Sequence, residues 1–285
     1  MNIIELFEYS GIYSENLRGF TPEDVIKVRK QFDIEQSQNP AVNRDVADNL
    51  ILAMNENAKE LLFISNNRIL YNFFSGKNYS RNRFSSDNAV SVSKESVQLF
   101  IQKYLEKDLD SFFDKSLENN RFDNIDDLMM VKEYLPQSLI DTLGIKINNK
   151  LDLVFDKINA DPSLRDAFSS IEFFQQKSFY DLASHFRSAE MDQKIKNIYY
   201  KLSDALVDQR IKNQLLHPVM TAMANYKAVD SHLANLLTAN RNKVFAETES
   251  ASNRGGSGGM STWSYIVVII VILRLILVMA RCGRM

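Results

Sequence analysis

Histidine and cysteine are the side chains that most often bind metals or carry acid–base chemistry, and this chain has few of them. The histidines are His185, His217 and His232, and the one cysteine is Cys282. A metal site on a helix commonly places two ligands at positions i and i+4, on one face, and no two of these histidines are so spaced. A single cysteine can form neither a cysteine-based zinc site nor an internal disulfide. We interpret the histidines as surface or capping residues and predict no metal.

Acidic pairs and a basic-aromatic stretch are the remaining candidates for chemistry. Asp126 and Asp127 could act as an acid–base pair, but adjacent acids on an amphipathic helix typically mark its solvated face. Residues 77–84 combine Lys, Arg, Tyr and Phe, a composition used to bind single strands or phosphates and equally suited to lipid headgroups, but we favour a plain solvated loop over both. Glycine-rich phosphate loops and nucleophile elbows are missing. The sequence predicts no catalytic residue and no cofactor, and it leans away from an enzyme.

Composition and charge favour a helical globular body that does not bind nucleic acid. The chain is 45% hydrophobic and 25% charged, with only 9 glycines and 5 prolines among 285 residues, which favours helices over turn-rich β-structure. Residues 251–285 contain four arginines and no acid, a charge of +4. The remaining 30 basic and 36 acidic residues leave the body at −6. An acidic body lacks the basic footprint that phosphate backbones require.

An apolar run near the C-terminus predicts a single transmembrane helix. Its 18 residues, 263–280, would form a helix of about 27 Å, close to the thickness of a bilayer core. The anchor residues at its edges and within it are aromatic or basic: Trp263, Tyr265, Arg274, Arg281 and Arg284. Aromatic rings favour the headgroup layer, and basic residues favour anionic lipid. We expect the lipid bilayer to be one partner of this chain.

The sequence gives conflicting signals for the orientation of that helix, and the role of Arg274 stays open. Arg274 either snorkels toward an interface or pairs with an acidic group of another transmembrane helix. Arg281 and Arg284 favour a cytoplasmic C-terminus under the positive-inside rule. The first residues carry no secretory signal pattern. We therefore expect a tail-anchored, single-pass membrane protein whose soluble domain is cytosolic.

Four segments are expected. Residues 1–92 form an N-terminal helical part with a polar loop at 76–92, and residues 93–247 form a larger helical domain. Residues 248–260 form a Gly/Ser linker that behaves as a flexible coil spanning about 20 Å, and residues 261–285 hold the anchor and a short basic tail. The fold class is mainly α: a soluble multi-helix domain plus one transmembrane helix.

Apolar spacing and capping residues predict the helices of the body. The expected helices cover 21–32, 46–61, 96–117, 124–135, 151–158 and 161–175. Thr21 should cap the first of them, with Pro22 at its first position and Asp24 completing a capping box. Residues 61–74 are ambiguous, because two apolar runs flank an Asn pair. They form either two helices that break there or a small β-hairpin, and we favour the helices.

A long helical hairpin over residues 188–246 is the clearest prediction. Ser188 should cap its first helix, and Pro218 should open its second. Six apolar side chains could form a partner face if the stripe is left free, although packing on the rest of the body is favoured: Leu202, Leu206, Met223, Tyr226, Leu233 and Leu237. A free stripe could bind a protein partner or a second copy, as in a coiled coil.

The sequence favours a membrane-tethered interaction or scaffolding protein without a catalytic motif. Two alternatives stay open. The chain could be a subunit of a membrane transport or envelope complex, held by Arg274, or a membrane-anchored enzyme whose site is assembled from distant residues.

Overall fold

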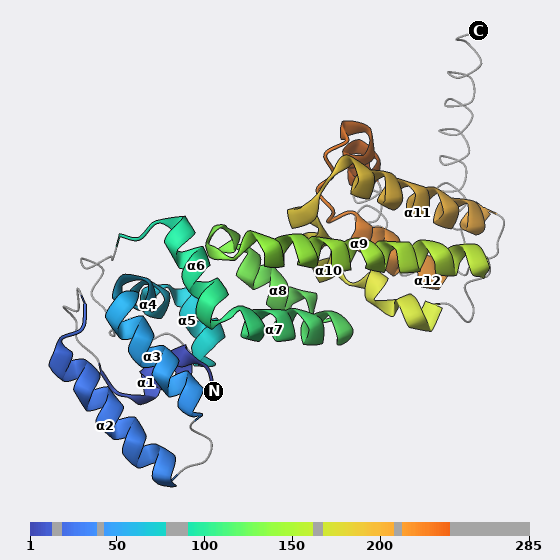
Figure 1. Cartoon of the computed structure of the whole chain (residues 1–285). Coiled ribbons are helices and arrows are strands. Elements are labelled where there is room, and N and C mark those ends of the chain that lie inside the picture. The colour runs from blue at the N-terminus through green and yellow to red at the C-terminus, as the bar shows by residue number, and fades with distance from the viewer. Residues whose placement is uncertain (13–18, 39–42, 78–90, 162–167, 208–212, 240–285) are drawn as a thin grey trace, which may run out of the picture. The chain divides into compact units, whose positions relative to one another are not determined.

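The computed structural model describes residues 1–12, 19–38, 43–77, 91–161, 168–207 and 213–239, and every regular element in these ranges is a helix (Figure 1). The prediction of a mainly α fold is therefore confirmed. In these same ranges no helix is both long and apolar enough to cross a bilayer. The linker 248–260 and the predicted anchor 261–285 lie outside the described residues.

The chain divides into two compact units, residues 1–143 and 144–285. The division falls within helix α9 (Gln137–Ala160), after Leu143. The sequence placed a boundary near residue 92 instead, because residues 76–92 are polar. Most of that polar stretch, residues 78–90, lies outside the described residues, and helices on both of its sides belong to the first unit.

The first unit is built from helices (Figure 1), and their buried side chains form an apolar core. Their bounds are α1 (Ile3–Tyr9), α2 (Pro22–Gln38), α3 (Arg44–Glu56), α4 (Ala58–Asn66), α5 (Arg68–Ser75), α6 (Lys94–Tyr104), α7 (Glu106–Glu118), α8 (Phe122–Met129) and η2 (Lys132–Tyr134). Helix α1 packs on α3 and α5, α4 packs on α5 and α6, and α8 packs on α5 and α7. Such helices are stable together because each buries an apolar stripe against the others.

Two predicted helices are each broken into two. The expected helix 46–61 is interrupted at Asn57, and the expected helix 96–117 at Leu105, both of which leave helical geometry with φ near −130°. Neither site has a glycine or proline to mark it. Leu105 is fully buried, so the break keeps this side chain in the core while the chain changes direction. Tertiary packing overrides the continuous helical pattern here.

Residues 61–74 form two helices, α4 and α5, so the β-hairpin alternative is wrong. They break at Asn67, as the helical alternative expected. Its side-chain oxygen accepts hydrogen bonds from the backbone N–H groups of Ile69 and Leu70, both at 3.1 Å. Asn67 is thus the N-cap of α5, which satisfies donors that a helix start leaves unpaired.

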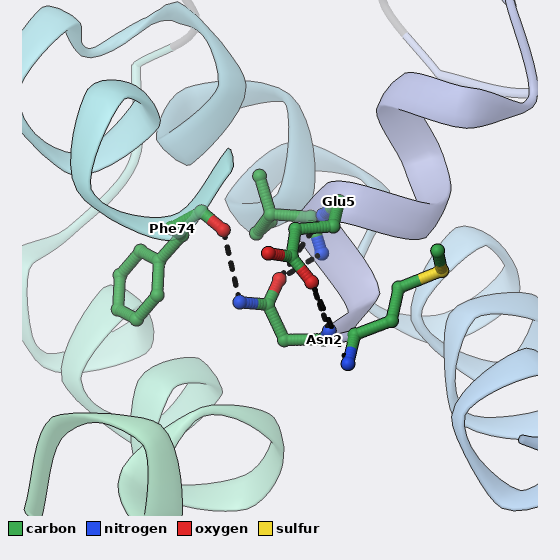
Figure 2. A network of polar contacts seen from close by, with 5 residues as sticks. Asn2, Glu5 and Phe74 are labelled. Carbon is green, nitrogen blue, oxygen red and sulfur yellow. Dashed lines mark hydrogen bonds and ion pairs between the residues drawn. The ribbon is translucent and has the colours of Figure 1, made fainter. Parts of the chain in front are cut away.

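A polar network ties helix α1 to the end of α5 (Figure 2). The Asn2 side-chain oxygen accepts from the backbone of Glu5, while the Glu5 carboxylate accepts from the Asn2 N–H at 2.8 Å. The Asn2 amide nitrogen also donates to the Phe74 carbonyl at 2.9 Å, across 72 residues of sequence. This capping box stabilises α1 and holds it against α5.

The second unit contains most of α9 together with η3 (Phe168–Gln175), α10 (Lys177–Ala183), η4 (Ser184–Phe186), α11 (Ala189–Val207), α12 (Asn213–Met223) and a helical stretch at 231–239. Helix α12 packs on η3, α10 and α11. The expected helix 151–158 is part of the longer α9. Of the expected helix 161–175, residues 168–175 form a 3-10 segment, and residues 162–167 are not described.

The predicted hairpin is confirmed only in its first helix. Ser188 caps α11 by accepting from the Met191 N–H at 3.2 Å. The second helix differs from the prediction, because Pro218 lies inside α12 and this helix ends at Met223. The chain then turns before helix resumes at residue 231. One continuous apolar spacing therefore covers two helical segments separated by a turn.

Candidate functional site

An apolar groove in the first unit is the strongest candidate for a binding site. It has a volume of about 670 Å³ and lies among α5, α7 and α8. Its lining residues are Arg68, Ile69, Asn72, Phe73, Phe112, Asn124, Asp127, Leu128 and Met130. This volume lies within the roughly 300–1,000 Å³ that is typical of ligand pockets.

Aromatic and aliphatic side chains form the floor of this groove. The rings of Phe73 and Phe112 meet edge to face, with centroids 4.6 Å apart and planes at 78°, a favourable geometry for aromatic pairs. Phe73 also contacts Phe74, which is buried in the core. The floor is therefore held by core packing and is formed before any partner binds.

Met130 is one of the residues that line the groove, and it is 75% exposed. It follows α8 directly, at the C-cap position. A methionine side chain is flexible and polarizable, so it adapts to apolar groups of different shape. An exposed apolar side chain beside an apolar floor adds contact area for a bound molecule.

Charged and amide side chains stand around the floor. Arg68 opens α5 and Asp127 lies in the last turn of α8, and both are exposed. Neither side chain has an ion-pair partner within the part of the chain that the structure describes. Asn72 and Asn124 supply amide groups. These polar groups can orient a bound molecule, while the apolar floor supplies contact area.

The two helices on one side of the groove are acidic. Residues 106–129 contain eight acidic and three basic side chains, a net charge of −5 at pH 7. Asp108 lies one helical turn before Phe112 and is exposed at the surface, and partial desolvation is the largest influence that raises the pKa of its carboxyl. At neutral pH this side of the groove therefore carries excess negative charge.

The lining of the groove combines apolar side chains with a few polar groups. It contains no histidine, cysteine, serine or threonine, and the Asp127 carboxylate is the one lining group that could act as a nucleophile or a base. No group of three metal-binding side chains occurs among the described residues. What the geometry provides is an apolar surface of defined shape between two unpaired charges.

A second polar cluster lies in the second unit, around the buried carboxylate of Asp192 on α11. Asp192 accepts hydrogen bonds from the Tyr226 hydroxyl and from the Asp230 N–H, both at 2.6 Å. Burial and then the contact with Asp192 raise the pKa of Tyr226. The carboxylate of Asp230 in turn lies 3.5 Å from the Lys196 ammonium. These contacts fix the turn after α12 against α11, so the cluster is structural.

The structure places the residues of the predicted partner face in the core of the second unit. Leu202, Met223, Leu233 and Leu237 are buried there, as is Tyr226. Intramolecular packing therefore occupies this stripe, which is the use that the sequence favoured over a free face. The Leu206 and His217 side chains and all five predicted anchor residues lie outside the described residues.

Sequence reasoning missed the groove. The sequence indicates Asp127 only as part of a solvated acidic face, and Phe73 only as part of an ambiguous apolar run. The two signals that could have indicated the groove are the charge excess of 106–129 and the Met129-Met130 pair at the end of a short helix. Neither indicates which elements meet. Comparison with protein-family models, curated proteins and solved structures finds no match to this chain.

Proposed function

We propose that this protein is a membrane-tethered interaction protein that binds a partner protein in the groove among α5, α7 and α8. The observation that carries the proposal is the preformed floor of Phe73 and Phe112 with the exposed Met130 in the same lining. Apolar anchors that meet a shaped pocket supply most of the affinity in protein interfaces. The surrounding polar groups supply orientation and selectivity.

The membrane tether is the second part of the proposal. It is supported by the apolar run 263–280, its aromatic and basic flanks, and the Gly/Ser linker before it. A flexible linker lets the body reach partners near the membrane without docking rigidly on it. We propose that the body faces the cytosol, since its lack of cysteine suits a reducing compartment.

Protease protection on membrane vesicles of known orientation tests the tether, using the full chain with a tag at Met1. We expect the tag to stay with the membranes through a carbonate wash and to be digested from the cytosolic side. A chain extracted by carbonate contradicts the tether. A protected tag contradicts the cytosolic orientation and leaves the tether intact.

Substitution of Met130 tests the interaction, because its exposed side chain can be changed with little effect on the core. The variant Met130→Lys is compared with Leu99→Lys, since Leu99 is also largely exposed, at 65%, but does not line the groove. We expect at least one protein that copurifies with the wild-type chain from solubilised membranes to be lost from Met130→Lys and retained by Leu99→Lys. If both variants keep the same proteins as wild type, the groove is not the interaction site.

Arg274 supports a second candidate function, as a subunit of a membrane complex. A charged residue within an apolar run is costly in lipid unless it reaches an interface or pairs with another helix. If it pairs, Arg274→Leu reduces the size of the assembly in mild detergent, measured by light scattering. An unchanged assembly size contradicts this second function.

A further inference from the structure

We infer that the groove takes a basic amphipathic helix of a partner protein. This inference rests on the proposed function and adds the chemistry of the partner. It is carried by three observations: the apolar floor, the charge of the helices beside it, and the position of Asp127 at one end of α8.

The charge of α7 and α8 selects a basic occupant. Residues 106–129 carry −5, and charges of one sign on a surface attract and orient partners of the other sign. Asp127 is already part of this count, and the one further charged residue of the lining is Arg68, which reduces the excess from −5 to −4.

The end of α8 strengthens the negative potential at the groove. The last turn of this helix contains no basic residue and holds Asp127. A helix C-terminus carries partial negative charge from its unpaired carbonyl groups, and a carboxylate there adds to it. A Lys or Arg of the partner placed beside Asp127 and Met130 therefore gains from both charges.

The helices that line the groove indicate the secondary structure of the partner segment. An extended peptide that adds to a sheet needs an unpaired strand edge, and the described residues of the first unit contain helices and no strand. Three helices instead present an apolar floor open to solvent, the kind of surface that accepts side chains at i, i+3 or i+4, and i+7 of an amphipathic helix. Arg68 lies on α5 and not on the acidic helices α7 and α8, so it can contact an acidic side chain or a carbonyl group of the partner helix.

Synthetic helices provide the test. The probes are a fluorescent peptide of about five helical turns with Leu and Phe on one face and Lys on the other, a peptide with Glu in place of Lys, and a scrambled basic peptide. Fluorescence anisotropy measures their binding to the full chain in phosphatidylcholine nanodiscs. Empty nanodiscs measure binding to lipid alone, which is subtracted.

The basic amphipathic probe should bind at least about tenfold more tightly than the other two. Met130→Lys should weaken binding of this probe about tenfold or more, because apolar contact is lost and the new lysine repels the basic probe. Asp127→Lys should weaken it about fivefold in 50 mM salt and less in 500 mM salt, since exposed charges are screened. The matched controls are Leu99→Lys and Asp156→Lys, an exposed acid of α9, and both should bind within about twofold of wild type.

Each other outcome overturns the inference in a distinguishable way. Equal or tighter binding of the acidic probe overturns the choice of a basic partner and leaves the groove as an interaction site. Equal binding of the scrambled probe overturns the helical form. If no helix binds but 1-anilinonaphthalene-8-sulfonate does, with loss in Met130→Lys, the groove is a small-molecule site. Both this inference and the proposed use of the groove then fail, while the tether stands.

Discussion

Replacing Tyr226 by phenylalanine removes one oxygen atom from the buried cluster of the second unit. Asp192 is 3% exposed, and the Tyr226 hydroxyl donates to it at 2.6 Å. The aromatic ring of residue 226 stays in place in this variant, so core packing is preserved. The Asp192 carboxylate keeps the hydrogen bond from the Asp230 N–H, but it loses the only side-chain donor that the described residues give it.

The expected loss of stability is about 1.5–3 kcal/mol, the range for a hydrogen bond to a charged group. The upper half of this range applies if no water replaces the hydroxyl, because a buried carboxylate with a missing partner is poorly solvated. In the opening equilibrium of the turn 224–230, such a loss corresponds to a factor of about 10 to 150.

Hydrogen exchange measured by mass spectrometry reads this effect directly. The amide of Asp230 is itself bonded to Asp192, so peptides covering 224–232 should exchange about 10 to 150 times faster in Tyr226→Phe. Tyr200→Phe is the matched control, because this residue lies on the same helix α11 and no hydrogen bond of its hydroxyl is found in the described residues. Exchange in Tyr226→Phe that is no faster than in Tyr200→Phe refutes the reasoning.

An alkaline titration gives the same cluster a second test. Burial first, and the Asp192 contact next, raise the pKa of Tyr226 in the folded chain, while the unfolded chain titrates near pH 10. The neutral phenol therefore contributes stability that is complete below about pH 10 and is lost as pH rises toward the folded pKa. In Tyr226→Phe, the decrease of stability with pH above pH 10 should be smaller than in wild type. Part of the decrease should remain, because burial also raises the pKa of Tyr180.

Three further predictions concern single elements. Thr21→Ala should destabilise α2 by about 1 kcal/mol, seen as faster exchange of 22–38. Because hydrogen bonds from Thr21 lower the pKa of Asp24, the difference in exchange rate between wild type and Thr21→Ala should shrink as pH falls through the Asp24 pKa. A difference in exchange rate that does not change with pH contradicts the capping box. Gly144→Ala should lower the melting temperature, since the new Cβ would lie 2.9 Å from the Phe186 ring; in a Phe186→Ala background it should instead stabilise, by up to about 1 kcal/mol. Asn67→Ala should cost α5 about 1 kcal/mol and weaken binding of the basic helix; unchanged melting and binding would show that the cap is dispensable.

Features that depend on neighbouring residues could be predicted from the sequence. The capping box of Thr21 and Asp24 forms as expected, with the Asp24 carboxylate accepting from the Thr21 N–H at 2.9 Å and the Thr21 hydroxyl accepting from the Asp24 N–H at 3.2 Å. The cap of α11 by Ser188 was predicted for the same reason. In both cases the interacting groups lie three residues apart, so the pattern of residues specifies the contact without the rest of the fold.

Features that depend on the core could not be predicted in this way. Nothing around Leu105 breaks a helix locally, yet the helix ends there with its side chain fully buried. Pro218 illustrates the opposite case, because a residue that often opens a helix lies inside one. Packing decides both positions, and propensity is only a weak guide to it.

The groove extends this reasoning to function. Phe73 and Phe112 are 39 residues apart in sequence, and their contact exists only because α5 and α7 both pack beside α8. A periodic stripe is conspicuous in sequence because it serves the core, and the structure buries Leu202, Leu233 and Leu237 of the stripe in the second unit. The lining of the groove comes from three short helices whose residues lie far apart in sequence, so no single continuous stripe marks it. In such a chain, the strongest sequence pattern therefore indicates side chains that the core already buries. Exposed side chains such as Met130 and Asp127 indicate surface that can still bind another molecule.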